Sequence, residues 1–366
     1  MWVTSYSSFQ ALPDSYSALF EWAAGDSFCL TRWWFECLAG TITPSDRLCL
    51  IAVERDATGG HPLALLPCYL DSSNPNSGRG KSLRSLSNCY SMVFAPLVAA
   101  DADPAPVLRI LAEAISDTRP KYDVLRFQPL DRASPLFGAL QNGLRDADLI
   151  VQPYFHLGNW YECTAGMGSA DYLARRPTAL RNTIRRKAKV LAEVGARLEV
   201  IAGRADAERG LADYESVYSK SWKEPEPYPQ VIRSLARSCA AEGALRLGLV
   251  HLEGVPIAAQ IWIIWNGTAT LYKLAHDQRY DRLSPGTVLT MRMMERVIDI
   301  DRVAEVDFGV GDDPYKTQWM SQRRERWGIV AFDPGSVRGA LAMFRHLGGR
   351  KIKRLMAKYA PSAPNP

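Results

Sequence analysis

The sequence of 366 residues lacks the features that mark membrane-spanning, secreted and zinc-binding proteins. Its longest predominantly apolar run, Pro256 to Trp265, has about half the length that a membrane helix needs. Residues 1–5 contain neither the basic nor the apolar segment of a secretion signal. The seven cysteines are odd in number and form no Cys-x-x-Cys, which predicts reduced thiols in a cytoplasmic protein and argues against disulfides.

Common catalytic signatures are also missing. The chain has no phosphate-binding loop of the pattern G-x-x-x-x-G-K-[ST], no H-E-x-x-H, no G-x-S-x-G and no set of kinase motifs. Hydrophobic residues make up 47% and charged residues 23%, as in globular proteins, and the length is typical of two domains. The five histidines are isolated from one another, which predicts that no metal is bound: His61, His156, His251, His276 and His346.

Acidic residues are absent from two stretches, although the net charge is only +5. Residues 172–192 carry seven basic side chains and no acidic one, and seven more follow Asp333, again without an acid. The two basic blocks predict contact with an anion, such as a phosphate, a nucleic acid or a membrane face. Ordinary solvated helix faces are the alternative.

Two distant stretches share one order of predicted elements, strand–strand–strand–helix–strand. Apolar runs joined by Asp/Gly or Glu/Gly turns indicate hairpins, and in each copy a proline opens the returning strand. The order predicts a duplicated α/β unit built on mixed sheets. The first copy takes 48–53, a strand from Pro62, 90–98, helix 107–116 and 124–127; the second takes 245–249, 256–262, 268–275, helix 287–300 and 303–308.

Helices are predicted between the copies and after them. Thr178 is placed to cap a helix that runs to Val194, and residues 213–221 and 231–241 follow as helices. Residues 340–359 have a broken apolar stripe, interrupted at Gly348-Gly349, before a tail predicted to be disordered. This stripe consists of Leu341, Phe344, Leu347, Ile352, Leu355 and Tyr359.

The first candidate site is the start of a helix at residues 282–287. Ser284 is a natural N-cap, Pro285 suits the first helical position, and Gly286 leaves the backbone exposed. Free N–H groups and the positive end of the helix dipole favour an anion there, and Arg282 stands just upstream. An ordinary capped helix is the alternative.

The second candidate site is the segment 306–316, where a short buried strand ends in glycines and acidic residues before a helix. Asp307, Tyr315 and Lys316 offer a carboxylate, a phenol and an ammonium for proton transfer and oxyanion stabilisation. The alternative is a plain strand–turn–helix in which the tyrosine packs and the lysine is solvated.

Together, these segments resemble the GNAT-superfamily acyltransferases of the CelD-like and FemAB-like branch. The resemblance rests on the duplicated unit and on segments 27–34, 124–127, 180–187 and 307–316. It implies an α/β fold of tandem GNAT-like mixed-sheet units with a helical connector and a C-terminal helix. Residues 282–287 depart from the usual loop [QR]-x-x-G-x-[GA], since they contain one glycine and a proline. The implied domains are 1–150, a first unit that forms the acceptor cleft and is degenerate for donor binding; 151–335, a second unit for acyl-donor binding and catalysis; and 336–366, a basic helix and tail.

The resemblance also implies a function, an acyl-CoA-dependent N-acyltransferase of the acetyltransferase type, without a metal. The amine acceptor would belong to envelope or exopolysaccharide metabolism. Lys316 would stabilise the developing negative charge, Tyr315 would protonate the leaving group and Asp307 would accept the amine proton. The donor phosphates would lie at Arg282, Ser284, Gly286 and Thr287, and an anionic part of the substrate at Arg181, Arg185 and Arg186.

Two alternatives differ in donor or in class. A FemAB-type enzyme would transfer an aminoacyl group from charged tRNA, bound through the basic blocks. A non-catalytic scaffold would instead dock on membrane-bound polysaccharide machinery through the basic C-terminal helix. The expected location is the cytoplasm, with a peripheral position at the inner membrane face.

Overall fold

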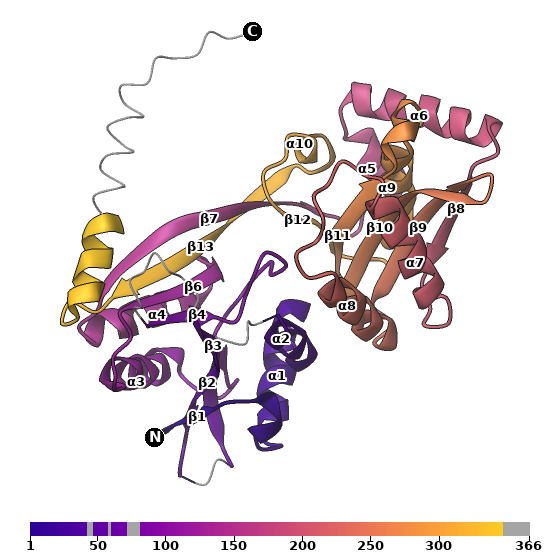
Figure 1. The fold of residues 1–366 in the computed structure, drawn as a ribbon. Coiled ribbons are helices and arrows are strands. Elements are labelled where there is room, and N and C mark those ends of the chain that lie inside the picture. Colours follow the sequence, from indigo (N-terminus) through magenta and orange to yellow (C-terminus); the bar gives the residue numbers. More distant parts are fainter. Residues whose placement is uncertain (42–46, 58–59, 72–80, 347–366) are drawn as a thin grey trace, which may run out of the picture. The chain divides into compact units, whose positions relative to one another are not determined.

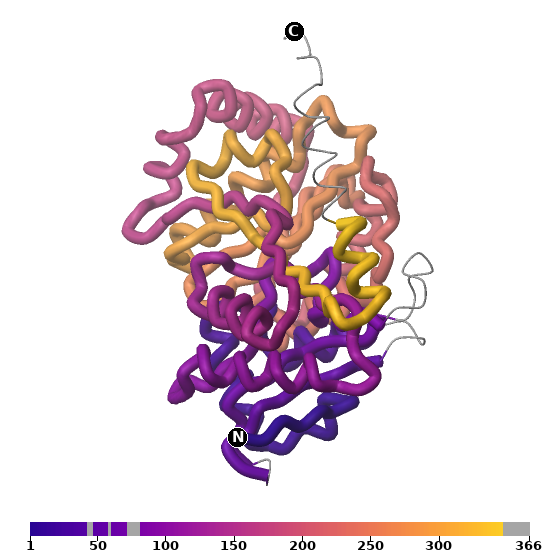
Figure 2. Tube along the Cα trace, turned by 90° about the vertical axis from the view of Figure 1, so that its left-hand side faces the viewer, coloured from indigo at the N-terminus to yellow at the C-terminus, as the bar shows by residue number. Residues whose placement is uncertain are grey.

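The computed structural model describes residues 1–41, 47–57, 60–71 and 81–346, which form two compact units (Figures 1 and 2). Unit 1 comprises residues 1–24, 29–156 and the chain from Arg326 on, and unit 2 comprises residues 25–28 and 157–325. The α/β class and the tandem arrangement predicted from the sequence are confirmed. The division falls after His156 and again before Arg326, not after residues 150 and 335, because two strands begin in one unit and end in the other.

Unit 1 contains a sheet with the strand order β1-β2-β3-β4-β6-β13. Neighbouring strands are antiparallel except β4 and β6, which are parallel over Ser82–Arg84 and Val124–Arg126. Helix α3 packs against α4 and against the sheet. The elements are β1 (Trp2–Tyr6), α1 (Tyr16–Ala24), α2 (Arg32–Ala39), β2 (Arg47–Glu54), β3 (Pro62–Asp71), β4 (Ser82–Ser85), β5 (Leu97–Val98), α3 (Pro104–Asp117), β6 (Val124–Asp131), α4 (Pro135–Asp146) and the end of β13 (Gln322–Phe332).

The strand predicted at residues 90–98 is wrong, because the strand that follows the β2–β3 hairpin is β4, and of residues 90–98 only the two of β5 pair with β3. A tight turn precedes β5. The backbone N–H of Tyr90 donates to Asn88 Oδ1 at 3.0 Å, and the N–H of Asn88 donates to Ser91 Oγ at 3.1 Å. These local hydrogen bonds use the donors that a strand would give to its neighbour.

Unit 2 repeats the plan in the strand order β7-β12-β11-β10-β9-β8. Its parallel pair is β11 and β12, and the other neighbours are antiparallel. The elements are the end of β7 (Ile150–Cys163), α5 (Ser169–Ala174), α6 (Thr178–Glu193), β8 (Arg197–Ile201), α7 (Ala207–Tyr218), α8 (Pro229–Ala241), β9 (Leu245–Leu252), β10 (Val255–Trp265), β11 (Thr268–His276), η4 (Gln278–Leu283), α9 (Pro285–Glu295), η5 (Arg296–Ile300), β12 (Glu305–Val310) and α10 (Lys316–Trp319).

Helices α7 and α9 cover opposite faces of the unit 2 sheet. A Cβ added to Gly210 of α7 would meet the Leu247 side chain, whereas one added to Gly248 would meet Leu289 and Met293 of α9. Successive strand residues point to opposite faces, so Leu247 faces α7 and its neighbour faces α9. Helix α6 packs on α9 and thereby adds a further layer on that side.

Several predicted helix starts shift. Pro177, not Thr178, holds the N-cap position of α6, and the Thr178 hydroxyl accepts from Arg181 at 3.0 Å. Helix α7 begins at Ala207, before the predicted 213. The C-terminal helix is described over residues 337–346; its predicted continuation to 359, and the tail, lie outside the described residues. No described helix is both long and apolar enough to cross a bilayer.

Candidate functional site

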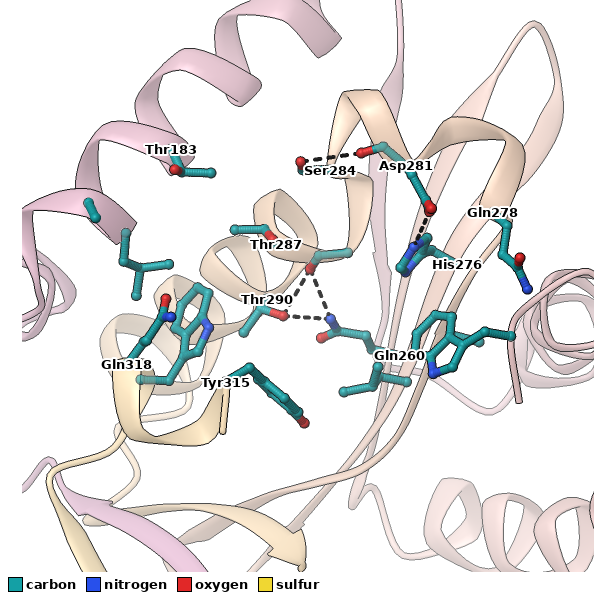
Figure 3. A pocket seen from close by; sticks show the side chains of 17 residues that line it. Thr183, Gln260, His276, Gln278, Asp281, Ser284, Thr287, Thr290, Tyr315 and Gln318 are labelled. Carbon is teal, nitrogen blue, oxygen red and sulfur yellow. Dashed lines mark hydrogen bonds and ion pairs between the residues drawn. The ribbon is translucent and has the colours of Figure 1, made fainter. Parts of the chain in front are cut away.

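A cavity of about 620 Å³ opens in unit 2 where β11 and β12 stop pairing (Figure 3). The two strands pair over only three residues each, Thr268–Thr270 of β11 with Glu305–Asp307 of β12. Beyond that point the C-terminal end of β11 and the segment after β12 line the cavity from two sides, and α6 and α9 contribute further lining residues. The space between two parallel strands that have parted is therefore open to a ligand.

The first turn of α9 faces this cavity. Gly286, Thr287 and Thr290 line it, and a Cβ on Gly286 would lie 3.4 Å from His276 Nδ1. Pro285 takes the first helical position as predicted. The positive end of the helix dipole consequently lies at the cavity wall.

Ser284 holds the predicted N-cap position of α9, but its side chain does not cap the helix. Its backbone is left-handed (φ 50°, ψ 50°), and its side chain makes no capping hydrogen bond; the hydroxyl donates instead to the Asp281 carbonyl at 3.4 Å. A residue in this conformation turns its side chain away from the N–H groups of the first helical turn. Ser284 nevertheless lines the cavity, whereas Arg282 is not among the lining residues.

Gln260 forms a fixed polar floor. Its side chain is 1% exposed, and its Nε2 donates to Thr290 Oγ1 at 2.7 Å and to the Gly286 carbonyl at 3.2 Å. The indole of Trp262 donates to Gln260 Oε1 at 2.9 Å, which decides the orientation of the amide. Every polar atom of this side chain thus has a partner: the nitrogen holds β10 to the start of α9, and the oxygen is held by Trp262 within β10.

A histidine–aspartate pair stands at the end of β11, and sequence reasoning missed it. His276 Nε2 lies 2.7 Å from Asp281 Oδ1, and the imidazole packs against Trp222 with ring centroids 4.6 Å apart and ring planes inclined by 47°. All three residues line the cavity (Figure 3). With Nε2 donating to the carboxylate, Nδ1 is left as the acceptor on the side of Gly286. The sequence offered one signal, an aspartate five residues after the histidine. A search for histidines that lie close to other histidines does not detect such a pair.

Of the three residues predicted for catalysis, only Tyr315 lines the cavity. Its ring packs beside Phe308 with centroids 6.5 Å apart, and 39% of the residue is exposed. Partial burial, and to a lesser degree Asp313, raises the pKa of its phenol above the ordinary value, so the hydroxyl keeps its proton at neutral pH.

Lys316 is turned away from the cavity and is 3% exposed. Its ammonium donates to the carbonyls of Val310 at 2.6 Å and Gly311 at 3.2 Å, and lies 3.2 Å from the Asp313 carboxylate. Burial lowers the pKa of this ammonium, and Asp313 opposes the shift. All three donors have partners in the turn between β12 and α10, so the structure gives Lys316 the task of holding that turn.

Asp307 is likewise buried in a network outside the cavity lining. Its carboxylate accepts from Asn159 Nδ2 at 2.6 Å, from the backbone N–H of Gly309 at 2.6 Å and from Arg324 at 2.5 Å. Arg324 also pairs with Glu305 at 2.8 Å. Both oxygens of this carboxylate are thus engaged by the protein's own donors, away from the cavity where a substrate amine would bind.

A second hollow of about 610 Å³ runs along α6 and shares Ala179 and Thr183 with the cavity. Arg185 and Arg186 line it together with Lys189. Arg181, the third arginine predicted to bind substrate, lines neither hollow, and its guanidinium donates to Thr178. Within the described residues no carboxylate forms an ion pair with Arg185 or Arg186, which leaves their charges available to an anion.

Comparisons with known proteins identify one matching domain family and several solved structures of similar fold. Residues 178–317 match the model of the acetyltransferase (GNAT) domain family. No curated protein is detectably similar in sequence. Among solved structures, FemX superposes with a TM-score of 0.60 at 11% identity, over 90% of this chain and 97% of that one. A conserved protein of unknown function from Bacteroides thetaiotaomicron superposes with a TM-score of 0.56 at 11% identity, over 91% and 100%.

A third solved structure, the C-terminal domain of a putative lysylphosphatidylglycerol synthetase from Agrobacterium fabrum, has a TM-score of 0.50 at 11% identity, over 81% and 88%. At such identities the likeness concerns the fold alone. The matched segment 178–317 contains α9, β11, β12 and all the residues that line the cavity except Gln318 and Trp319. Residues 178–317 therefore match a GNAT acetyltransferase domain, and the chain shares its fold with these solved structures.

Proposed function

We propose that unit 2 is an N-acyltransferase of the acetyltransferase type that takes its acyl group from acyl-CoA. The observation that carries this proposal is the cavity between the parted strands β11 and β12, with the start of α9 at its wall. An elongated thioester fits such a space, with its phosphates at the positive end of the helix and its carbonyl among the strand ends. Ser284, Gly286 and Thr287 would surround the phosphates, as the sequence predicted.

The proton of the attacking amine is assigned to His276. Attack of an amine on a thioester carbonyl forms a tetrahedral intermediate, and the thiolate leaves when it collapses. The amine must lose a proton during this sequence, and an imidazole oriented by a carboxylate is a suitable acceptor. His276 and Asp281 form such a pair in the cavity, whereas the carboxylate of Asp307 is held by Arg324 and Asn159.

Tyr315 is assigned to the leaving thiolate, as the sequence predicted, but as a hydrogen-bond donor. Its raised pKa means that the phenol is protonated at neutral pH and can donate a hydrogen bond to the departing sulfur. Because such a phenol is a weaker acid than a thiol, the hydrogen bond would stabilise the thiolate and the proton itself would come from solvent. Lys316 would affect the reaction only indirectly, because it holds the turn that carries Tyr315. The acceptor class, an amine of envelope or exopolysaccharide metabolism, stays a prediction from the family resemblance.

A second candidate donor is aminoacyl-tRNA, and one observation favours it. Arg185, Arg186 and Lys189 line a hollow that adjoins the cavity, and an RNA phosphate backbone would find several cations there. This donor would bind with a steep salt dependence, because each neutralised phosphate releases a counterion. The binding of acyl-CoA would depend much less on salt, because CoA carries only a few phosphates.

Calorimetric titration of the purified chain with acetyl-CoA tests the donor. Gly286→Val would extend a side chain toward His276 and into the cavity, so we expect it to abolish binding. Gly203→Val is the matched control, because an added Cβ there meets nothing within 4 Å. If the unaltered protein binds charged tRNA and no acetyl-CoA, the aminoacyl-transfer alternative replaces this proposal. If both variants bind acetyl-CoA equally well, the cavity is not the donor site.

A further inference from the structure

The helix over residues 337–346 is fixed to unit 1 by its first turn. Ser336 caps it, since Gly339 donates its N–H to Ser336 Oγ at 3.2 Å and the Ser336 hydroxyl is hydrogen-bonded to Asp123. A Cβ at Gly339 would lie 2.3 Å from the Asp333 carbonyl and 2.9 Å from that of Asp123. The helix therefore rests on the backbone of unit 1 along the side where only glycine fits.

Three large apolar side chains of this helix lie on the opposite side. Successive residues of a helix are rotated by about 100°, which places Val337, Leu341 and Phe344 within about 40° of the direction opposite Gly339. Their exposed fractions agree: 87%, 50% and 69%. His346 is on the packed side, where its ring lies 5.6 Å from that of Phe332. The described part of the predicted apolar stripe, Leu341 and Phe344, thus belongs to an outward ridge.

Basic residues border the ridge. Arg338 and Arg345 fall on one flank of it, both exposed. The chain after Asp333 contains seven basic and no acidic residues, so this part alone carries more than the whole net charge of +5. An apolar ridge beside positive charge combines the two attractions by which amphipathic helices bind to an anionic bilayer surface.

We propose that this helix docks unit 1 on the surface of a membrane that contains anionic phospholipids. Charge complementarity selects this occupant. A second copy of the helix would bring like charges together, and a nucleic acid would leave Val337, Leu341 and Phe344 in water. A bilayer surface accepts the apolar ridge among its acyl chains and the arginines among its phosphates. The docking does not depend on the proposed acyl transfer.

Sedimentation with lipid vesicles tests the proposal on the full chain. We expect binding to phosphatidylcholine vesicles with about 30 mol% phosphatidylglycerol, and much weaker binding to phosphatidylcholine alone. Raising the salt concentration from about 0.1 M to 0.5 M should release the protein, because each arginine near the headgroups contributes about fivefold to partitioning and this share is screened. The double variant Leu341→Asp/Phe344→Asp should lower partitioning at least about tenfold, because the apolar contribution is lost.

The controls separate docking from misfolding and from general stickiness. Both substituted side chains are exposed, so the melting temperature of the double variant should match that of the unaltered protein. Ile300→Asp removes an apolar side chain that is 63% exposed elsewhere, and it should leave vesicle binding unchanged. The proposal is overturned if the unaltered protein stays in the supernatant with anionic vesicles, or if the double variant and Ile300→Asp bind them alike.

Discussion

Replacing His276 by glutamine separates proton transfer from donor binding. The amide of glutamine can still reach Asp281 and fill the space beside Trp222, but it cannot accept the proton of the attacking amine. General bases contribute about 100-fold to 10,000-fold, so we expect a loss of kcat in that range. The binding of acetyl-CoA should change little, because the phosphates are assigned to the start of α9 and not to the imidazole.

Asp281 acts on the reaction only through the imidazole. Its carboxylate lies 2.7 Å from His276 Nε2 and is itself well exposed to solvent. Asp281→Asn should therefore lower kcat less than His276→Gln does, and the double variant should be no slower than His276→Gln alone. Such non-additivity is the signature of two residues that work as one unit.

The assay follows thiol release from acetyl-CoA in the presence of a panel of amino sugars and amino acids, with calorimetry for donor affinity. A His276→Gln variant that transfers the acyl group at the full rate would refute the assignment while leaving the acyltransferase proposal intact. An unaltered protein that binds acetyl-CoA but shows no thiol release with any amine would instead count against the acceptor class.

Three further outcomes follow from the geometry. Lys316→Met should destabilise the fold by about 1–3 kcal/mol for each loop carbonyl left without a donor, measured by chemical denaturation, with acetyl-CoA affinity retained; unaltered stability would contradict the structural role. Arg185→Ala should raise KM for an anionic substrate and leave the melting temperature unchanged, since exposed charges contribute little to stability; an unchanged KM would assign Arg185 to a solvated face. Burial lowers the pKa of Lys223 from 10.5 to about 8, so the unfolded chain binds more protons between these values and the free energy of unfolding should rise with pH there. Lys223→Met should remove that rise in denaturation at a series of pH values, and an identical pH profile would show that the lysine is not buried.

The order of elements could be predicted because punctuation by glycine, proline and acidic residues is local. Both hairpins that open a sheet, β2–β3 and β9–β10, were found in this way. The two strands that begin in one unit and end in the other could not be predicted. Their pairings, β7 with β12 and β13 with β6, join segments far apart in the chain. The local sequence of a strand does not determine which of several apolar strands will pair with it.

The candidate site was predicted in part, for the same reason. Gly286 and Tyr315 stand at a helix start and after a strand end, positions that a sequence pattern marks, and both line the cavity. The imidazole of His276 acquires its chemistry from Asp281 in η4 and from Trp222, which follows α7. Only the fold brings these groups together.

The motif at the end of β12 illustrates how neighbouring residues divide their work. Tyr315 and Lys316 are adjacent, and about 100° of rotation separates adjacent side chains in a helical turn. One side chain consequently enters the cavity while the other turns back to the carbonyls of Val310 and Gly311. Gly311, with φ of 102°, allows the backbone to present its carbonyl to that ammonium. The lysine fixes the turn, and the fixed turn sets the position of the tyrosine, so a loss of activity in a Lys316 variant would be expected to act through Tyr315.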